Sequence, residues 1–167
     1  EPQLIVEGGL ETNDLVLHPY YEQMQQVGAD LLWVNGAVLY KFEAIHRKSN
    51  TQSFLAAVAG FEYTSVGIFD SVYDIGWLAE YQYDERDASF FVPAQNDVMV
   101  GVRWIWNDPD STELLMGYVQ DLDDMETYSA FVEASSRMTD NWKWTLNGYF
   151  FSTQSQTDPY FFVRRDD

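Results

Sequence analysis

The feature that most constrains this chain is a two-residue alternation that runs through residues 95–153. Four segments of about strand length are joined there by the polar turns NDPD, DDME and TDN. One set of alternate positions is apolar or aromatic: Val98, Val100, Val102, Trp104 and Trp106 in the first segment, and Trp142, Trp144, Leu146, Gly148 and Phe150 in the last. Successive side chains of a strand point to opposite faces. We therefore expect four antiparallel strands with one apolar face and one mixed, charged face.

The same alternation predicts four earlier strands, at residues 22–34, 37–47, 52–64 and 74–84. Asn35-Gly36 is the strongest hairpin signal between them and predicts a type I′ turn. Residues 65–73 form a connection with room for a helical turn, and residues 85–94 form the longest internal loop. Residues 1–21 read mostly as loop, with a short hairpin as an option, and residues 154–167 read as loop.

The connections are too short to cross a sheet, so consecutive strands should be neighbours. The predicted fold class is all-β, an antiparallel up-and-down meander with about eight strands between residues 22 and 153. Residues 1–167 would then form a single β-barrel domain or a fragment of one. In a membrane, this would be a complete or partial transmembrane β-barrel.

Composition narrows the classes of partner and chemistry. The formal charge of −18 argues against nucleic acid, because a polyphosphate would be repelled. The chain has no cysteine, which excludes disulfides and thiolate metal sites. There is no run of about 18 apolar residues, as a membrane-spanning helix needs, but barrel strands of about ten alternating residues remain open. No cofactor motif is present.

Charged residues inside the predicted strands gather on the face opposite the aromatic one. They are Lys41, Glu43, Glu62, Glu80, Arg103, Glu133, Arg137 and Lys143. A soluble barrel turns such residues outward, whereas a membrane barrel turns them into its lumen, and the strand pattern is the same in both. In a lumen they would set ion selectivity in a wide pore, or pair and plug a narrow one.

The positions of tryptophan favour the membrane interpretation. In a meander, alternate connections share a rim, and one rim then lies close to every tryptophan: Trp33, Trp77, Trp104, Trp106, Trp142 and Trp144. Tyr81, Tyr83, Tyr118 and Tyr128 lie toward the opposite rim, which also has the longer loops. Girdles of amphipathic aromatics are typical of barrels at the two bilayer interfaces. The alternative is that large aromatics fill one end of a closed soluble barrel.

Longer stretches carry a resemblance to a known group of proteins. They are YEQMQQVGADLLW, YKFEAI, AAVAGFEYTSVGIFDSVYDIGWLAEYQYDERD, TELLMGYVQDLDD, TDNWKWTLNGYFF and DPYFFVRRDD. From about Tyr21 onward the chain resembles the C-terminal part of uncharacterised, porin-like outer-membrane β-barrel proteins of marine gammaproteobacteria. Such barrels end in a strand with a terminal aromatic residue, whereas this chain ends at Asp167 in a loop. The resemblance implies that strands precede Glu1 and that the chain is a fragment.

Two groups of residues were considered for other chemistry. Turn carboxylates offer weak calcium ligands at Asp108, Asp110, Asp121 and Asp123, although Asp also favours turns for its own backbone bonds. His46 with Ser49 or Ser53 is the nearest approach to a nucleophile and base, and it lacks a supporting motif.

We therefore expect no enzymatic activity and no specific metal. The expected function is that of an outer-membrane β-barrel, porin-like or structural, with passive passage of small solutes as one role. Its partners would be the lipid bilayer and other chains that pair at open strand edges. The alternative is a soluble β-barrel or sandwich that binds a small apolar ligand.

Overall fold

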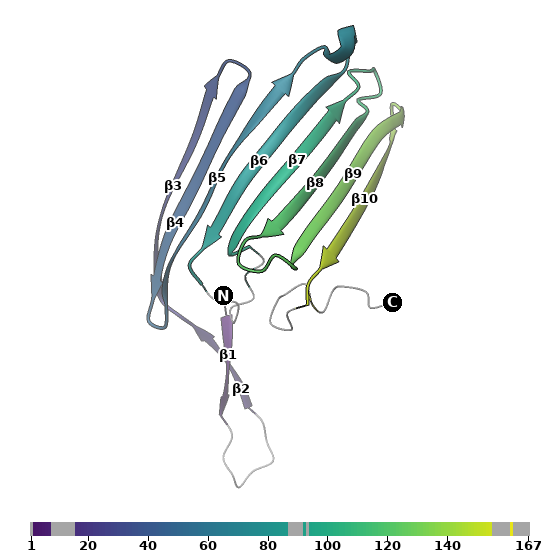
Figure 1. The fold of residues 1–167 in the computed structure, drawn as a ribbon. Helices are drawn as coiled ribbons and strands as arrows, with labels where there is room; N and C mark the ends of the chain where they lie inside the picture. The colour runs from purple at the N-terminus through teal and green to yellow at the C-terminus, as the bar shows by residue number, and fades with distance from the viewer. Residues whose placement is uncertain (1, 8–15, 87–91, 93, 155–160, 162–167) are drawn as a thin grey trace.

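The computed structural model describes residues 2–7, 16–86, 92, 94–154 and 161, with only the backbone for residues 2–7 and 16–20. Its main unit is an eight-stranded antiparallel sheet in which every strand pairs with its neighbours in sequence (Figure 1). The strands are β3 (Met24–Asn35), β4 (Val38–Ser49), β5 (Ser53–Ser65), β6 (Asp74–Asp84), β7 (Asn96–Ile105), β8 (Glu113–Asp121), β9 (Tyr128–Thr139) and β10 (Trp142–Ser152). The meander predicted from the sequence is confirmed. The sheet is open, with β3 and β10 at its two edges.

The N-terminal segment differs from the expectation of mostly loop. β1 (Pro2–Glu7) and β2 (Val16–Tyr21) form a separate two-stranded antiparallel hairpin. Both strands are rich in the branched residues that fit a pleated backbone. The short hairpin option is therefore the better description of this segment, and His18 lies in β2 rather than in a loop.

The connection between β5 and β6 contains the helical turn for which the sequence left room. Residues Ile68–Asp70 form a short 3₁₀ helix, η1, which follows Gly67. Within the described residues, no helix combines the length and apolar character that would let it cross a membrane. The predicted loop at 154–167 lies outside the described residues, apart from Gln154 and Phe161.

The hairpin between β3 and β4 forms, but its turn differs from the predicted one. Asn35 pairs with Val38 in the ladder, so the loop residues are Gly36 and Ala37. Of these two residues, only Gly36 has a positive φ, of 63°. A type I′ turn needs a positive φ at both central positions, so this turn is of another type. This register sets Trp33 opposite Tyr40, and their rings stack with centroids 5.1 Å apart. The stacking gives a physical reason for the shift of one residue.

The ladder gives the sheet two chemically distinct faces. Directly paired residues of antiparallel strands lie on the same face. From Trp33 through Tyr40, Phe61, Ala79 and Val100, the pairing traces a row that is entirely apolar or aromatic. We call this side the aromatic face and the other the polar face.

The aromatic face is largely uncovered. Val100 at the centre of β7 is 48% exposed, and Phe42, Phe61 and Met116 on other strands are each more than 40% exposed. Few large apolar residues are buried in the described part of the chain: Phe54, Ile75 and Val92. The sheet therefore lacks the large apolar core expected of an isolated soluble domain.

Close approach of two strands requires a glycine at position 60. A Cβ there would lie 2.5 Å from the carbonyl oxygen of Ala79 and 2.6 Å from Cγ of Glu80. At Gly76 on the neighbouring strand, the nearest atom to a Cβ would be 3.5 Å away, an ordinary contact.

We predict that Gly60→Ala destabilises the fold by about 1–3 kcal/mol, because backbone must move to admit the methyl group. Gly76→Ala is the matched control and should be tolerated. Urea unfolding followed by tryptophan fluorescence measures both. Equal midpoints for the two variants would contradict the close packing of β5 on β6.

Candidate functional site

The polar face holds all eight in-strand charges that the sequence singled out. Register places on this face the residues Lys41, Glu43, Glu62, Glu80, Arg103, Glu133, Arg137 and Lys143. The ladder also places Asp30, Asp97 and Glu113 on this face. Asp30 is paired directly with Glu43, and alternation along β3 was the signal for it. Acidic residues outnumber basic ones on the polar face.

Glu62 is the centre of a charge cluster that spans four strands. Its carboxylate lies 3.4 Å from Nζ of Lys41 on β4 and 3.8 Å from Nη1 of Arg103 on β7. Arg103 reaches across β6 beside Gly76, its direct ladder partner, where even a methyl group would make only ordinary contacts with Arg103 and Glu62. The glutamate side chain is only 20% exposed, so it is partly shielded from water. One carboxylate thus forms ion pairs with two cations, which links the polar faces of β4 to β7.

A second set of polar contacts lies nearer β10. Nζ of Lys143 is 3.9 Å from a carboxylate oxygen of Glu113, and both side chains are more than 40% exposed. The hydroxyl of Tyr149 donates a hydrogen bond of 3.1 Å to Glu133. Arg137 is the direct ladder partner of Lys143. These contacts are looser than the Glu62 cluster and leave the side chains in reach of solvent.

The polar face is hollowed at several points. One hollow of about 280 Å³ lies between Arg103, Glu113, Glu133 and Lys143. Another of about 370 Å³ includes the carboxylates of Asp30, Glu43 and Glu80. The first hollow is lined mostly by charged and polar residues, which suits water and ions, whereas the second also has Leu31, Leu32, Phe42 and Val58 in its lining.

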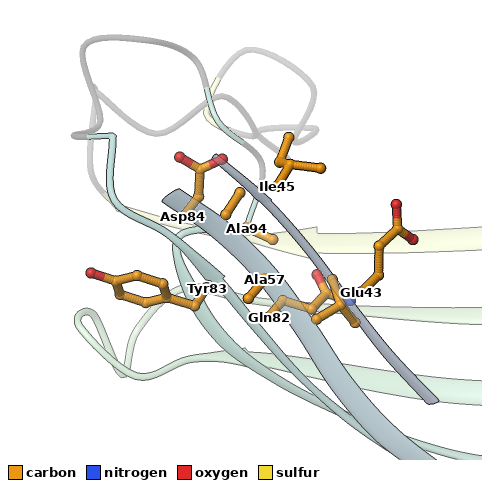
Figure 2. Close-up of a pocket in the computed structure, with 9 residues that line it drawn as sticks. Glu43, Ile45, Ala57, Gln82, Tyr83, Asp84 and Ala94 are labelled. Carbon is orange, nitrogen blue, oxygen red and sulfur yellow. The ribbon is translucent and has the colours of Figure 1, made fainter. Parts of the chain in front are cut away.

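A further hollow, of about 240 Å³, lies at the end of the sheet next to the connection between β6 and β7. Figure 2 shows Ile45, Asp84 and Ala94 close together in it, whereas the ring of Tyr83 points away from them. Asp84 and Tyr83 are neighbours in β6, so they lie on opposite faces. The hollow therefore belongs mainly to the polar face.

An arginine and a phenylalanine anchor the chain beside this hollow. The Arg86 guanidinium makes two hydrogen bonds to the carboxylate of Asp84, of 2.8 and 2.6 Å. It also stacks over the ring of Phe54, 4.1 Å from the centroid, and Phe54 is 2% exposed. This fork-like pairing fixes the start of the long loop at the rim opposite the tryptophans.

The six tryptophans all lie toward one rim of the sheet, as the sequence predicted. Trp33 and Trp142 flank hairpin turns, and Trp77 pairs with Tyr63 in the register. Trp104 lies 5.8 Å from Trp106, centroid to centroid. The aromatic rings therefore form a band at one level of the sheet, which we call the tryptophan rim.

Four tyrosines, Tyr81, Tyr83, Tyr118 and Tyr128, lie on the same face toward the other rim, whereas Tyr40 and Tyr63 lie beside tryptophans. The rings of Tyr118 and Tyr128 stack with centroids 5.7 Å apart, and their strands β8 and β9 are neighbours. The Tyr81 hydroxyl donates a hydrogen bond to the side-chain oxygen of Asn96, at 2.8 Å. Between the two rims, the face is made of small and aliphatic residues such as Ala79, Val100 and Val132.

Two of the four turn carboxylates predicted as weak calcium ligands, Asp108 and Asp121, bond their own turns. Asp121 accepts hydrogen bonds from the N–H groups of Asp123 and Asp124. Asp108 accepts one from Thr112, and hydrogen bonds from this residue lower the pKa of the Asp108 carboxyl. In the part of the chain that the structure describes, no three acidic or histidine side chains are grouped to hold a metal ion. The carboxylates of Asp108 and Asp121 thus serve the turn backbone, whereas that of Asp123 accepts a hydrogen bond from the side chain of Asn96.

His46 and Ser53 do come together, on the aromatic face. His46 Nε2 lies 3.2 Å from the Ser53 hydroxyl, within hydrogen-bonding distance. Among the described hydrogen bonds, none orients the other ring nitrogen, and a nucleophile–base pair needs such a third group. The pair is exposed at the end of β4 and β5 and has no preorganised oxyanion donors that the contacts identify.

We predict that Glu62→Gln weakens folding by about 1 kcal/mol, because it leaves two cations without a carboxylate in a partly shielded site. Glu43→Gln is the matched control, since among the described residues Glu43 takes part in no ion pair. Urea midpoints of the two variants and the parent chain measure the difference. An equal loss for both variants would show that the Glu62 cluster has no special role.

Comparison with known proteins adds no family to this geometry. The chain matches no protein-family model, no curated protein and no solved structure. The resemblance to outer-membrane barrels therefore stays a prediction, and the function must be argued from the faces, rims and edges of the sheet.

Proposed function

We propose that this chain is a segment of an outer-membrane β-barrel, with the aromatic face toward lipid and the polar face toward an aqueous interior. The observation that carries the proposal is the arrangement of the aromatic face. It stays exposed at its centre, and all of its tryptophans lie toward one rim, with Tyr40 and Tyr63 beside them. A second group of tyrosines lies toward the other rim: Tyr81, Tyr83, Tyr118 and Tyr128. In a bilayer, indole and phenol rings favour the two interfaces, while aliphatic side chains favour the hydrocarbon between them.

Strand lengths support the same orientation. The strands of the main sheet contain between 9 and 13 residues. A tilted strand needs about 9–11 residues to cross the hydrocarbon layer. Acidic turns such as 107–110 and 121–124 then lie beyond the aromatic bands, where water solvates them.

The polar face decides what the interior does. Its hollows and its partly exposed charges suit passive passage of small solutes, in which case the acidic excess favours cations. The Glu62 cluster instead suits a structural role, because paired charges fill space and rigidify the wall. Both roles belong to a porin-like or structural envelope protein without enzymatic activity.

A soluble barrel or sandwich with an apolar ligand is supported less well. It would enclose the aromatic face, and a ligand pocket would then be lined by that face. The hollows described above lie over the polar face instead.

We predict that Val100→Lys costs about 2–4 kcal/mol of folding free energy in lipid vesicles, because a charge at mid-strand would face hydrocarbon. Met99→Lys is the matched control: Met99 is the adjacent residue of β7 and lies on the polar face. Urea unfolding in vesicles, followed by tryptophan fluorescence, measures both variants. A chain that folds as a monodisperse species in plain buffer, and in which Val100→Lys is harmless, would contradict the lipid-facing orientation.

A pore is tested separately by conductance in a planar bilayer. We expect discrete channel events with a reversal potential that indicates cation preference, because acidic residues outnumber basic ones on the polar face. Bilayers that receive detergent alone are the control. If the protein folds and inserts into the bilayer but gives no channel events, the pore hypothesis is wrong and the structural role is favoured.

A further inference from the structure

The two edges of the sheet are unprotected. β3 is exposed at all of its positions, and β10 at most of its positions. Natural edge strands are usually blunted by several charges, by proline or by short length. β3 has one charged residue, Asp30, in twelve, and neither strand contains proline. Within the part of the chain that the structure describes, no strand pairs with the outer side of β3 or of β10, so both edges can accept a further strand.

We propose that β10 of one chain pairs with β3 of a second copy of the same chain. The inference rests on the proposed lipid-facing orientation in one respect, because a bilayer keeps the tryptophan rims of both copies at the same level. β3 runs toward this rim and β10 runs away from it, so the two strands are antiparallel when the rims are aligned. Pairing β3 with β3, or β10 with β10, in antiparallel fashion would place the rims at opposite levels.

Charge complementarity supports this choice of edges. The only charged side chain of β3 is Asp30, and the only charged side chain of β10 is Lys143. Both lie on the polar face, and Lys143 is 44% exposed, so a second carboxylate can approach it. Pairing either edge with itself would instead bring like charges together.

The register that sets Lys143 opposite Asp30 makes a specific set of neighbours. It places Asn147 opposite Gln26 on the polar face, and Leu146 opposite Val27 on the aromatic face. Apolar residues meet apolar ones, and polar residues meet polar ones, so both faces continue across the junction. The same contact within one chain would require β3 and β10 to meet, whereas they lie at opposite edges of the open sheet (Figure 1).

The absence of cysteine makes a direct test possible. Chains with Gln26→Cys are mixed with chains with Asn147→Cys, folded in detergent micelles, and oxidised. We expect a disulfide-linked product of twice the mass of the 19.4 kDa chain from the mixture, and far less from either variant alone. The double substitution Ala44→Cys with Ala57→Cys is the internal control, because these residues are direct partners in β4 and β5.

Other outcomes would overturn the proposal. An internal disulfide in the chain with both Gln26→Cys and Asn147→Cys, without a product from the mixture, would show that one chain closes on itself. A product from Gln26→Cys alone would show pairing of like edges. A mixture without any product, in a fold confirmed by the internal control, would show that a different partner covers the edges.

A charge exchange gives a second measurement. Asp30→Lys and Lys143→Asp should each reduce the mixed disulfide several-fold, and the chain with both changes should recover it, because the pair is then reversed. If the chain with both changes does not recover the mixed disulfide, the proposed register of Asp30 opposite Lys143 is wrong. Oxidation of the same mixture in plain buffer separates this proposal from the lipid-facing one. A mixed disulfide that forms in buffer would support edge pairing even if the aromatic face proved not to contact lipid.

Discussion

The structure depends on the constancy of strand register across eight strands. Side chains alternate with a period of two, so a slip of one residue in any pairing would exchange the aromatic and polar faces beyond that point. Specific contacts oppose such a slip. Trp33 stacks on Tyr40 on one face, and Glu62 binds Lys41 and Arg103 on the other. The ring of Phe131 covers Gly117, where a Cβ would lie only 2.3 Å from it. Each face thus fixes the register on which the other depends.

Strand positions followed from the sequence because alternation and turns are local signals. The predicted range 74–84 coincides with β6, and the ends of the other main strands lie within about two residues of their predicted places. The turn at Gly36 was less predictable. The loop can consist of Asn35 and Gly36 or of Gly36 and Ala37. The choice depends on the stacking of Trp33 on Tyr40 across the hairpin, which the local sequence does not reveal.

The polar site was predictable by face but not by contact. Alternation placed Glu43, Glu62 and Glu80 on one side, yet only Glu62 forms the cluster. Its contacts run diagonally between strands, and the one with Arg103 passes over Gly76 on the adjacent strand β6, so they depend on register. Glu113 pairs with Lys143 across β9, which no spacing along the chain reveals.

Lipid contact and edge pairing are physically linked in this fold. In water, the free N–H and C=O groups of β3 and β10 can bond solvent, so an open sheet is tolerable. In hydrocarbon, each unsatisfied group costs several kcal/mol, and an open edge of about ten residues is excluded. An aromatic face that contacts lipid therefore requires that both edges be covered. Asp30 and Lys143 supply opposite charges on the polar face of those edges, where water remains, so they can select the partner without exposing charge to lipid.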